Sequence, residues 1–151
     1  MISELPSMTL KAIGTVRNSI KQAPGAGYNW QNVSSELVLD NSLTDALDNL
    51  DEFSHIIIIY WIHKSRRSSP KKVRPMGNPE HALMGVFATR SPDRPNPIGK
   101  ATVRLLQRRD NILTVKGLDA IDGTPVIDIK PYIPGYDSVD NAKVPSWVVK
   151  S

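Results

Sequence analysis

Four consecutive isoleucines at positions 56–59 lie in the most apolar stretch of the chain, residues 55–61. β-Branched side chains favour strands, and a stretch without polar alternation is typical of a strand covered on both faces. The apolar residues 56–62 are too few to span a bilayer, which requires about 20 residues of helix. We therefore expect a buried strand at residues 55–61, central to the core of a folded domain.

The rest of the chain predicts short strands separated by turns. Apolar or period-two patterns indicate further strands at residues 9–17, 36–39, 83–89, 101–106, 112–118 and 126–130. Leu43, Ala46, Leu47 and Leu50 form one apolar helix stripe, which Ser42 and Asp45 would cap. About seven strands and one short amphipathic helix predict a mainly β fold, a barrel or a sandwich, formed as a single domain over residues 1–151.

Composition excludes several kinds of chemistry. The chain has no cysteine, hence no disulfide, thiolate metal site or cysteine nucleophile, and its three histidines argue against a dedicated metal site. The net charge of +4 is compatible with a polyanionic partner. An exposed basic loop is predicted at residues 64–79, with Lys64, Arg66, Arg67, Lys71, Lys72 and Arg74. With no basic leader before a long apolar segment, we expect a soluble cytoplasmic protein, not a membrane protein.

A stiff turn is predicted at residues 90–99, which hold three prolines at positions 92, 95 and 97. Each proline fixes its own φ and restricts the residue before it, so Ser91, Arg94 and Asn96 are held in place at little further entropic cost. Such preorganised polar groups suit a binding site. The alternative is a rigid connector whose arginines are merely solvated.

Two other features have a functional and a structural interpretation. Period-two alternation places Asp128 and Lys130 on one face of a strand, either in a cleft or as an exposed ion pair. His55 and His63 bracket the apolar strand, roughly 26 Å apart at about 3.3 Å per residue, too far to share a metal. His63 is the better site candidate and His55 the structural one. No glycine-rich dinucleotide or Walker-type loop is present.

Two blocks occur in order, GVFATRSPDRPNPIG at residues 85–99 and LDAIDGTPVIDIKPY at residues 118–132. Shorter blocks lie at residues 13–17, 50–55 and 73–75. Together they resemble the TsaA-like, TrmO-type tRNA N6-methyltransferases over most of the chain. The resemblance implies a single-sheeted β-barrel that binds S-adenosylmethionine and works as a homodimer. The implied reaction methylates N6 of the threonylcarbamoyl-adenosine next to the anticodon of a threonine tRNA.

The resemblance also implies site residues. Those implied at the S-adenosylmethionine site are Ala23, Pro24, Gly25, His63, Lys64, Arg90, Lys100, Asp119, Ala120, Ile121 and Asp122. Those implied as catalytic or RNA-facing are Arg90, Arg94, Asn96, Asp128, Lys130 and Tyr132, and no metal is implied. The stiff turns at residues 90–99 and 119–125 are then expected to hold a pocket for the methyl donor against bound RNA.

Chemistry suggests roles for some of these residues. The N6 lone pair is delocalised, so removal of its proton should help the attack, and Asp128 or His63 is the candidate base. Arg90 or Arg94 would pair with the threonyl carboxylate or with a phosphate. The competing hypotheses are a non-catalytic RNA-binding barrel and an interaction domain. Neither competitor predicts thermal stabilisation by S-adenosylmethionine.

Overall fold

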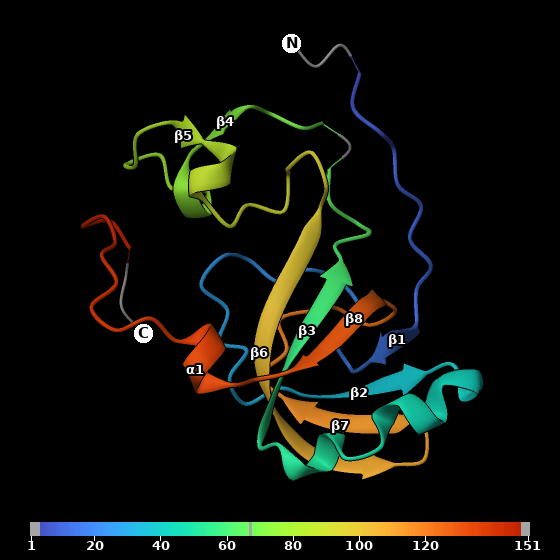
Figure 1. Ribbon diagram of the computed structural model, residues 1–151. Coiled ribbons are helices and arrows are strands. Elements are labelled where there is room, and N and C mark those ends of the chain that lie inside the picture. Colours follow the sequence, from blue (N-terminus) through green and yellow to red (C-terminus); the bar gives the residue numbers. More distant parts are fainter. Residues whose placement is uncertain (1–3, 67, 149–151) are drawn as a thin grey trace.

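Six antiparallel strands close into a barrel in the computed structural model, which describes residues 4–66 and 68–148 (Figure 1). The order around the barrel is β1 (Gly14–Arg17), β2 (Ser34–Leu39), β7 (Ile112–Lys116), β6 (Ile98–Arg109), β3 (His55–Trp61) and β8 (Pro125–Pro131), and β8 pairs back with β1. The mainly β barrel is thus confirmed, with six strands in the barrel instead of seven.

The apolar strand β3 lies between β6 and β8 and has the predicted bounds, residues 55–61. Ile56 and Ile58 have no exposed surface and point into the core, with Tyr60 beside them at 5% exposure. Ile57 and Ile59 alternate to the other face, where Ile57 is still buried and Ile59 half-buried. The outward face of β3 is thus shielded in its middle, whereas His55 and Trp61 at its two ends are exposed.

The barrel core is made by side chains that alternate inward from each strand. The fully buried members include Val16, Leu37, Val103, Leu113, Val115 and Val126. Leu118 continues the core beyond β7, and Leu47 closes it from the connection after β2. These side chains fill the interior, so a ligand cavity is confined to an end of the barrel.

Four local predictions are wrong. Residues 83–89 do not form one strand, because β5 (Met84–Gly85) has only the two-residue β4 (Lys72–Val73) as a partner and gives way to the 3₁₀ helix η4 (Val86–Ala88). The strand expected from residue 9 begins at Gly14, where pairing with β2 and β8 starts. The amphipathic helix is two 3₁₀ helices, η1 (Asn41–Leu47) and η2 (Leu50–Glu52), separated by Asn49 in a left-handed conformation. The cap of η1 is Asp40, which accepts from the Ser42 amide, instead of Ser42.

Residues 62–97 leave the barrel between β3 and β6 and carry β4, β5 and η3 (Pro75–Gly77) beyond its end (Figure 1). The predicted basic loop lies in this excursion, and Lys64, Arg66, Lys71, Lys72 and Arg74 are exposed there. Arg67 lies outside the described residues. After β8 a short helix, α1 (Pro134–Asp137), begins a largely exposed C-terminal segment. The excursion marks the barrel end, here called the mouth, at which β3 ends and β6 begins.

Candidate functional site

A cavity of about 510 Å³ lies at the mouth of the barrel. It is lined by the end of β3, by the loop after β1, and by both of the stiff turns that the sequence predicted at residues 90–99 and 119–125. The lining residues are Ala23, Trp30, Tyr60, Ile62, His63, Lys64, Ser65, Arg90, Ser91, Pro92, Arg94, Ile98, Gly99, Lys100, Asp119, Ala120, Ile121 and Thr124. The volume is in the range of small-molecule sites.

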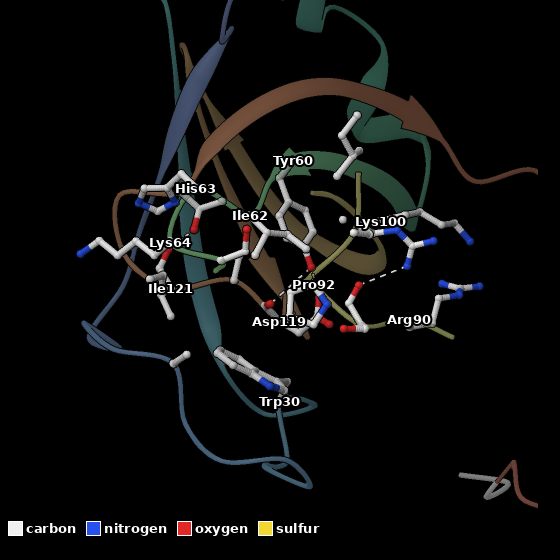
Figure 2. Close-up of a pocket in the computed structure, with 18 residues that line it drawn as sticks. Trp30, Tyr60, Ile62, His63, Lys64, Arg90, Pro92, Lys100, Asp119 and Ile121 are labelled. Carbon is white, nitrogen blue, oxygen red and sulfur yellow. Dashed lines mark hydrogen bonds between the residues drawn. The ribbon is translucent and has the colours of Figure 1, made fainter. Parts of the chain in front are cut away.

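Asp119 is held in place by Tyr60, as the dashed lines in Figure 2 show. The Tyr60 hydroxyl donates to Oδ1 of Asp119 at 2.7 Å and lies 3.3 Å from its main-chain oxygen. Partial desolvation raises the pKa of the Asp119 carboxyl, and the hydrogen bond from Tyr60 and the charge of Arg90 act in the opposite direction. Burial, together with the Asp119 charge, raises the pKa of Tyr60, so the phenol stays a donor. A fixed carboxylate therefore faces the cavity.

Gly99 makes room for this arrangement. It pairs with Tyr60 across β6 and β3, and a Cβ built on Gly99 would lie 2.5 Å from two atoms of the Tyr60 ring. The ring therefore crosses the neighbouring strand at a distance that a side chain on residue 99 would prevent. Tyr60 was not predicted as a site residue, because it lies in the apolar stretch at residues 55–61 that was expected to form core. The signal in the sequence for its role is Gly99, the residue opposite it.

The turn at residues 90–99 is braced by its own polar groups as well as by its prolines. Nη1 of Arg94 donates to the main-chain oxygens of Thr89 and Ser91 at 3.0 and 3.2 Å. Asp93 accepts from the Arg66 amide at 3.0 Å, which fastens the turn to the excursion. Arg94 thus lines the cavity, but one of its nitrogens, Nη1, is bonded to main-chain oxygens of its own turn. Arg90 is exposed at the cavity, and within the described residues its side chain has no hydrogen-bond or ion-pair partner.

The loop at residues 18–33 is tied to the turn at residues 119–125 through Asn18. Its Nδ2 donates to the Ala120 carbonyl at 2.8 Å, and its amide donates to the Asp122 carboxylate at 2.9 Å. Lys21 pairs with the other oxygen of that carboxylate at 2.8 Å. These two contacts hold the pKa of Asp122 below its usual value, the Lys21 bond most strongly. Asp122 therefore anchors the loop, and its side chain is not part of the cavity lining.

Cations and apolar side chains share the rest of the cavity. His63 and Lys64 lie on one side of Tyr60 and Asp119 in Figure 2, with Arg90 and Lys100 on the other and Trp30 below. Burial, followed by the charge of Lys64, lowers the pKa of His63, so its ring is uncharged at neutral pH. Trp30 was not among the predicted site residues, although it comes from the same loop as Ala23, which was.

The structure brings together some of the predicted site residues and separates others. The cavity is lined by Ala23, His63, Lys64, Arg90, Arg94, Lys100, Asp119, Ala120 and Ile121 and not by Pro24, Gly25, Asn96, Asp122, Asp128, Lys130 or Tyr132. Asp128 and Lys130 form a half-exposed ion pair at 3.0 Å, as in the structural interpretation of that motif. His55 bonds through Nδ1 to the Ser54 hydroxyl at 2.8 Å, at the opposite end of β3 from His63.

Among residues 4–66 and 68–148, no three histidine or acidic side chains converge as ligands for a metal ion. No helix within the same residues has the length and hydropathy needed to cross a bilayer. The fold and the site together define the class of protein, a closed antiparallel barrel with a ligand-sized, cation-rimmed cavity at its mouth.

The chain belongs to the tRNA-methyltransferase O N-terminal domain family, whose model matches residues 12–138. A probable S-adenosyl-L-methionine-binding protein of Archaeoglobus fulgidus is 44% identical over 138 residues, which cover 89% of this chain and 37% of that protein. The tRNA (adenine(37)-N6)-methyltransferase of Escherichia coli is 36% identical over 149 residues, which cover 91% of this chain and 63% of the relative.

Solved structures agree with this assignment. The crystal structure of TrmO from Pseudomonas aeruginosa matches with a TM-score of 0.76 at 31% identity and covers 96% of this chain and 63% of that one. The chain therefore spans only 37% to 63% of the length of these three proteins. The resemblance that the motifs suggested is confirmed at the level of the family.

Proposed function

We propose that this chain transfers a methyl group from S-adenosylmethionine to N6 of an adenine in tRNA. The observation that carries the proposal is the single cavity lined by both family motifs, with the Asp119 carboxylate fixed inside it by Tyr60. The names of the relatives support it, because they include an S-adenosylmethionine-binding protein and a tRNA (adenine(37)-N6)-methyltransferase.

The residues present fit the methyl donor. Trp30, Ile62 and Ile121 give apolar surface for an adenine ring, and Asp119 is a fixed acceptor for hydroxyl or ammonium hydrogens. Lys100 supplies positive charge for the carboxylate of the donor. When bound, the donor supplies an electrophilic methyl carbon on a sulfonium. The contribution of the protein is to hold that carbon and the attacking nitrogen in line with water excluded.

The acceptor, we further propose, is the threonylcarbamoyl-adenosine next to the anticodon of a threonine tRNA. The cavity favours His63 over Asp128 as the base that takes the N6 proton, because His63 lines it with an uncharged ring while Asp128 is paired with Lys130 outside it. Arg90 is the better partner for the threonyl carboxylate, because Arg94 already holds the turn.

The test is transfer of a labelled methyl group to tRNA with and without the threonylcarbamoyl group, followed by nucleoside analysis. We expect label on N6 of the modified adenosine and loss of transfer in Asp119→Ala, with Asp140→Ala, an exposed aspartate outside the cavity, as the matched control. Equal labelling of unmodified tRNA would show that the threonylcarbamoyl group is not required for methyl transfer.

Cofactor binding separates the enzyme from a non-catalytic RNA-binding barrel. At a hundred times its dissociation constant, S-adenosylmethionine adds about 2.7 kcal/mol to folding, which for a domain of this size raises the melting temperature by roughly 5 to 10 °C. No stabilisation by the donor, with tRNA binding retained, would favour the RNA-binding barrel. No response to either ligand would favour an interaction domain.

A homodimer and a cytoplasmic location belong to the same proposal. Support for a dimer comes from Met76, Leu83 and Phe87, which are 62%, 55% and 78% exposed on the excursion. We expect sedimentation equilibrium to give twice the chain mass and Phe87→Asp to give the monomer. A wild-type monomer at assay concentrations would refute the dimer. The cytoplasm is proposed as the location because it is the compartment that holds the tRNA substrate.

A further inference from the structure

The outward side chains of three neighbouring strands form one continuous face next to the cavity. Ile56, Ile58 and Tyr60 point into the core, so the alternate residues of β3 point outward, and cross-strand partners share their face. We call this face the outer wall. It comprises Lys100, Thr102 and Arg104 of β6, His55, Ile57, Ile59 and Trp61 of β3, and Asp128 and Lys130 of β8.

The outer wall carries an excess of positive charge. Its one acidic residue, Asp128, is paired with Lys130 at 3.0 Å. Within the described chain, the side chains of Lys100 and Arg104 form neither an ion pair nor a hydrogen bond, and both residues are exposed. Lys100 lies at the mouth of the cavity. Arg104, four positions further along β6 and about 13 Å away at about 3.3 Å per residue, is therefore available to an external anion.

An exposed aromatic ring joins the outer wall to the cavity. Trp61 is 50% exposed at the end of β3, and its ring lies edge-on to the His63 ring with 6.4 Å between the centroids. His63 and Lys100 both line the cavity, so the outer wall begins where the cavity opens. The exposed indole of Trp61 therefore lies beside the opening of the cavity.

We propose that the outer wall is the surface along which the RNA substrate lies, with Trp61 stacking on a base next to the methylated adenosine and Arg104 contacting a phosphate. This rests on the proposed function and adds the position of the RNA. An enzyme that modifies a base takes it out of its stack, which leaves the neighbouring base a free face. Proteins that bind unpaired RNA offer aromatic rings for such faces and cations for the backbone.

The charge pattern favours RNA over a second copy of this chain. In a twofold contact the same patch meets itself, so the net positive charge of the outer wall would face the same net positive charge on the other copy. Such like charges oppose association across an interface, whereas phosphates attract the cations of the wall. The large apolar side chains proposed for a dimer lie instead on the excursion, at Met76, Leu83 and Phe87.

The test compares two outer-wall variants with matched controls elsewhere. Trp61→Ala removes the stacking ring, and Tyr136→Ala removes an 85% exposed ring from α1. Arg104→Gln removes a cation from the wall, and Arg109→Gln removes one from the far end of β6. For each protein, filter binding gives the dissociation constant for tRNA over a range of salt concentrations, and calorimetry gives that for S-adenosylmethionine.

We expect Trp61→Ala to weaken tRNA binding by about 5- to 150-fold, the range for loss of one stacked base, with donor affinity unchanged. Arg104→Gln should reduce the salt slope of tRNA binding by about 0.7 to 0.9, the value for one lost phosphate contact. Tyr136→Ala and Arg109→Gln should match the wild type in both measurements.

Wall variants that bind tRNA as the controls do would overturn the proposal. So would a change of sedimenting mass in Trp61→Ala without a change of tRNA affinity, because the wall would then contact a second copy. A wild-type protein that binds tRNA without methylating it would refute the proposed function alone. The tRNA affinities of the variants would then still show whether RNA lies along the outer wall. Failure of the wild type to bind tRNA would overturn both.

Discussion

Replacing Gly99 by alanine should destabilise the barrel and loosen the cavity together. The new Cβ would lie 2.5 Å from Cε2 and Cζ of Tyr60 and 2.9 Å from its hydroxyl oxygen, closer than real side chains approach. Tyr60 is only 5% exposed and its hydroxyl is bonded to Asp119 at 2.7 Å, so the ring cannot move aside without loss of that bond. Overpacking of this kind costs about 1–3 kcal/mol. With a urea m-value of about 2 kcal/mol/M, the unfolding midpoint should fall by about 0.5–1.5 M.

Urea unfolding followed by tryptophan fluorescence measures this change, and Gly85→Ala is the control. A Cβ on Gly85 meets nothing within 4 Å, and the backbone there, at φ −55°, accepts any side chain. A double-mutant cycle isolates the cause: in a Tyr60→Ala background, Gly99→Ala should cost less than about 0.5 kcal/mol, because the clashing ring is gone. An equal cost in both backgrounds would show that the clash with Tyr60 is not the reason.

Three other perturbations test the cavity. Tyr60→Phe should weaken S-adenosylmethionine binding by roughly tenfold, since a net hydrogen bond is worth about 1.5 kcal/mol, with Tyr136→Phe unchanged in calorimetry. Asp119→Asn should raise the free energy of unfolding at neutral pH and leave it unchanged at a pH below the ordinary aspartate pKa. The pKa of Asp119 is raised in the folded state, so the wild type loses stability as the pH rises through that folded-state pKa. Melting temperatures of both proteins over a range of pH would show this difference. Asn18→Ala should increase protease cleavage within residues 18–33, because it removes the bond to Ala120; an unchanged cleavage rate would contradict the anchor.

Much of the fold could be predicted where local pattern and barrel pairing agree. The strand at residues 55–61 was predicted correctly because a continuous run of β-branched residues strongly favours a strand over other secondary structure. The strands expected at residues 101–106 and 112–118 are the antiparallel neighbours β6 and β7, and Asp110 in the turn between them adopts a left-handed φ of 53°. Residues 83–89 have a similar apolar pattern but lack a long neighbouring strand, and no local signal shows whether a partner strand exists.

The site was predictable in part because rigid turns leave a mark in the sequence. Three prolines indicated the turn at residues 90–99, and the structure adds that Arg94 braces it. Tyr60 was missed because an aromatic residue after an apolar run is usually core, and it is core apart from its hydroxyl. Asp128 and Lys130 were placed on one face correctly, but which face looks outward depends on the barrel closure and on the bulge opposite Ile59.

The mouth of the barrel is held by contacts that do not depend on a ligand. Asn18 ties the loop at residues 18–33 to the turn at residues 119–125, and Arg94 braces the turn at residues 90–99 from within. Asp119 is fixed from the barrel by Tyr60. Because each segment has its own attachment, binding of a methyl donor need not order any of them, and little of its interaction free energy is lost to conformational entropy. The separate attachments also make the cavity sensitive to single substitutions outside its lining, as Asp122 illustrates: its carboxylate never reaches the cavity, yet it holds both the Asn18 amide and Lys21.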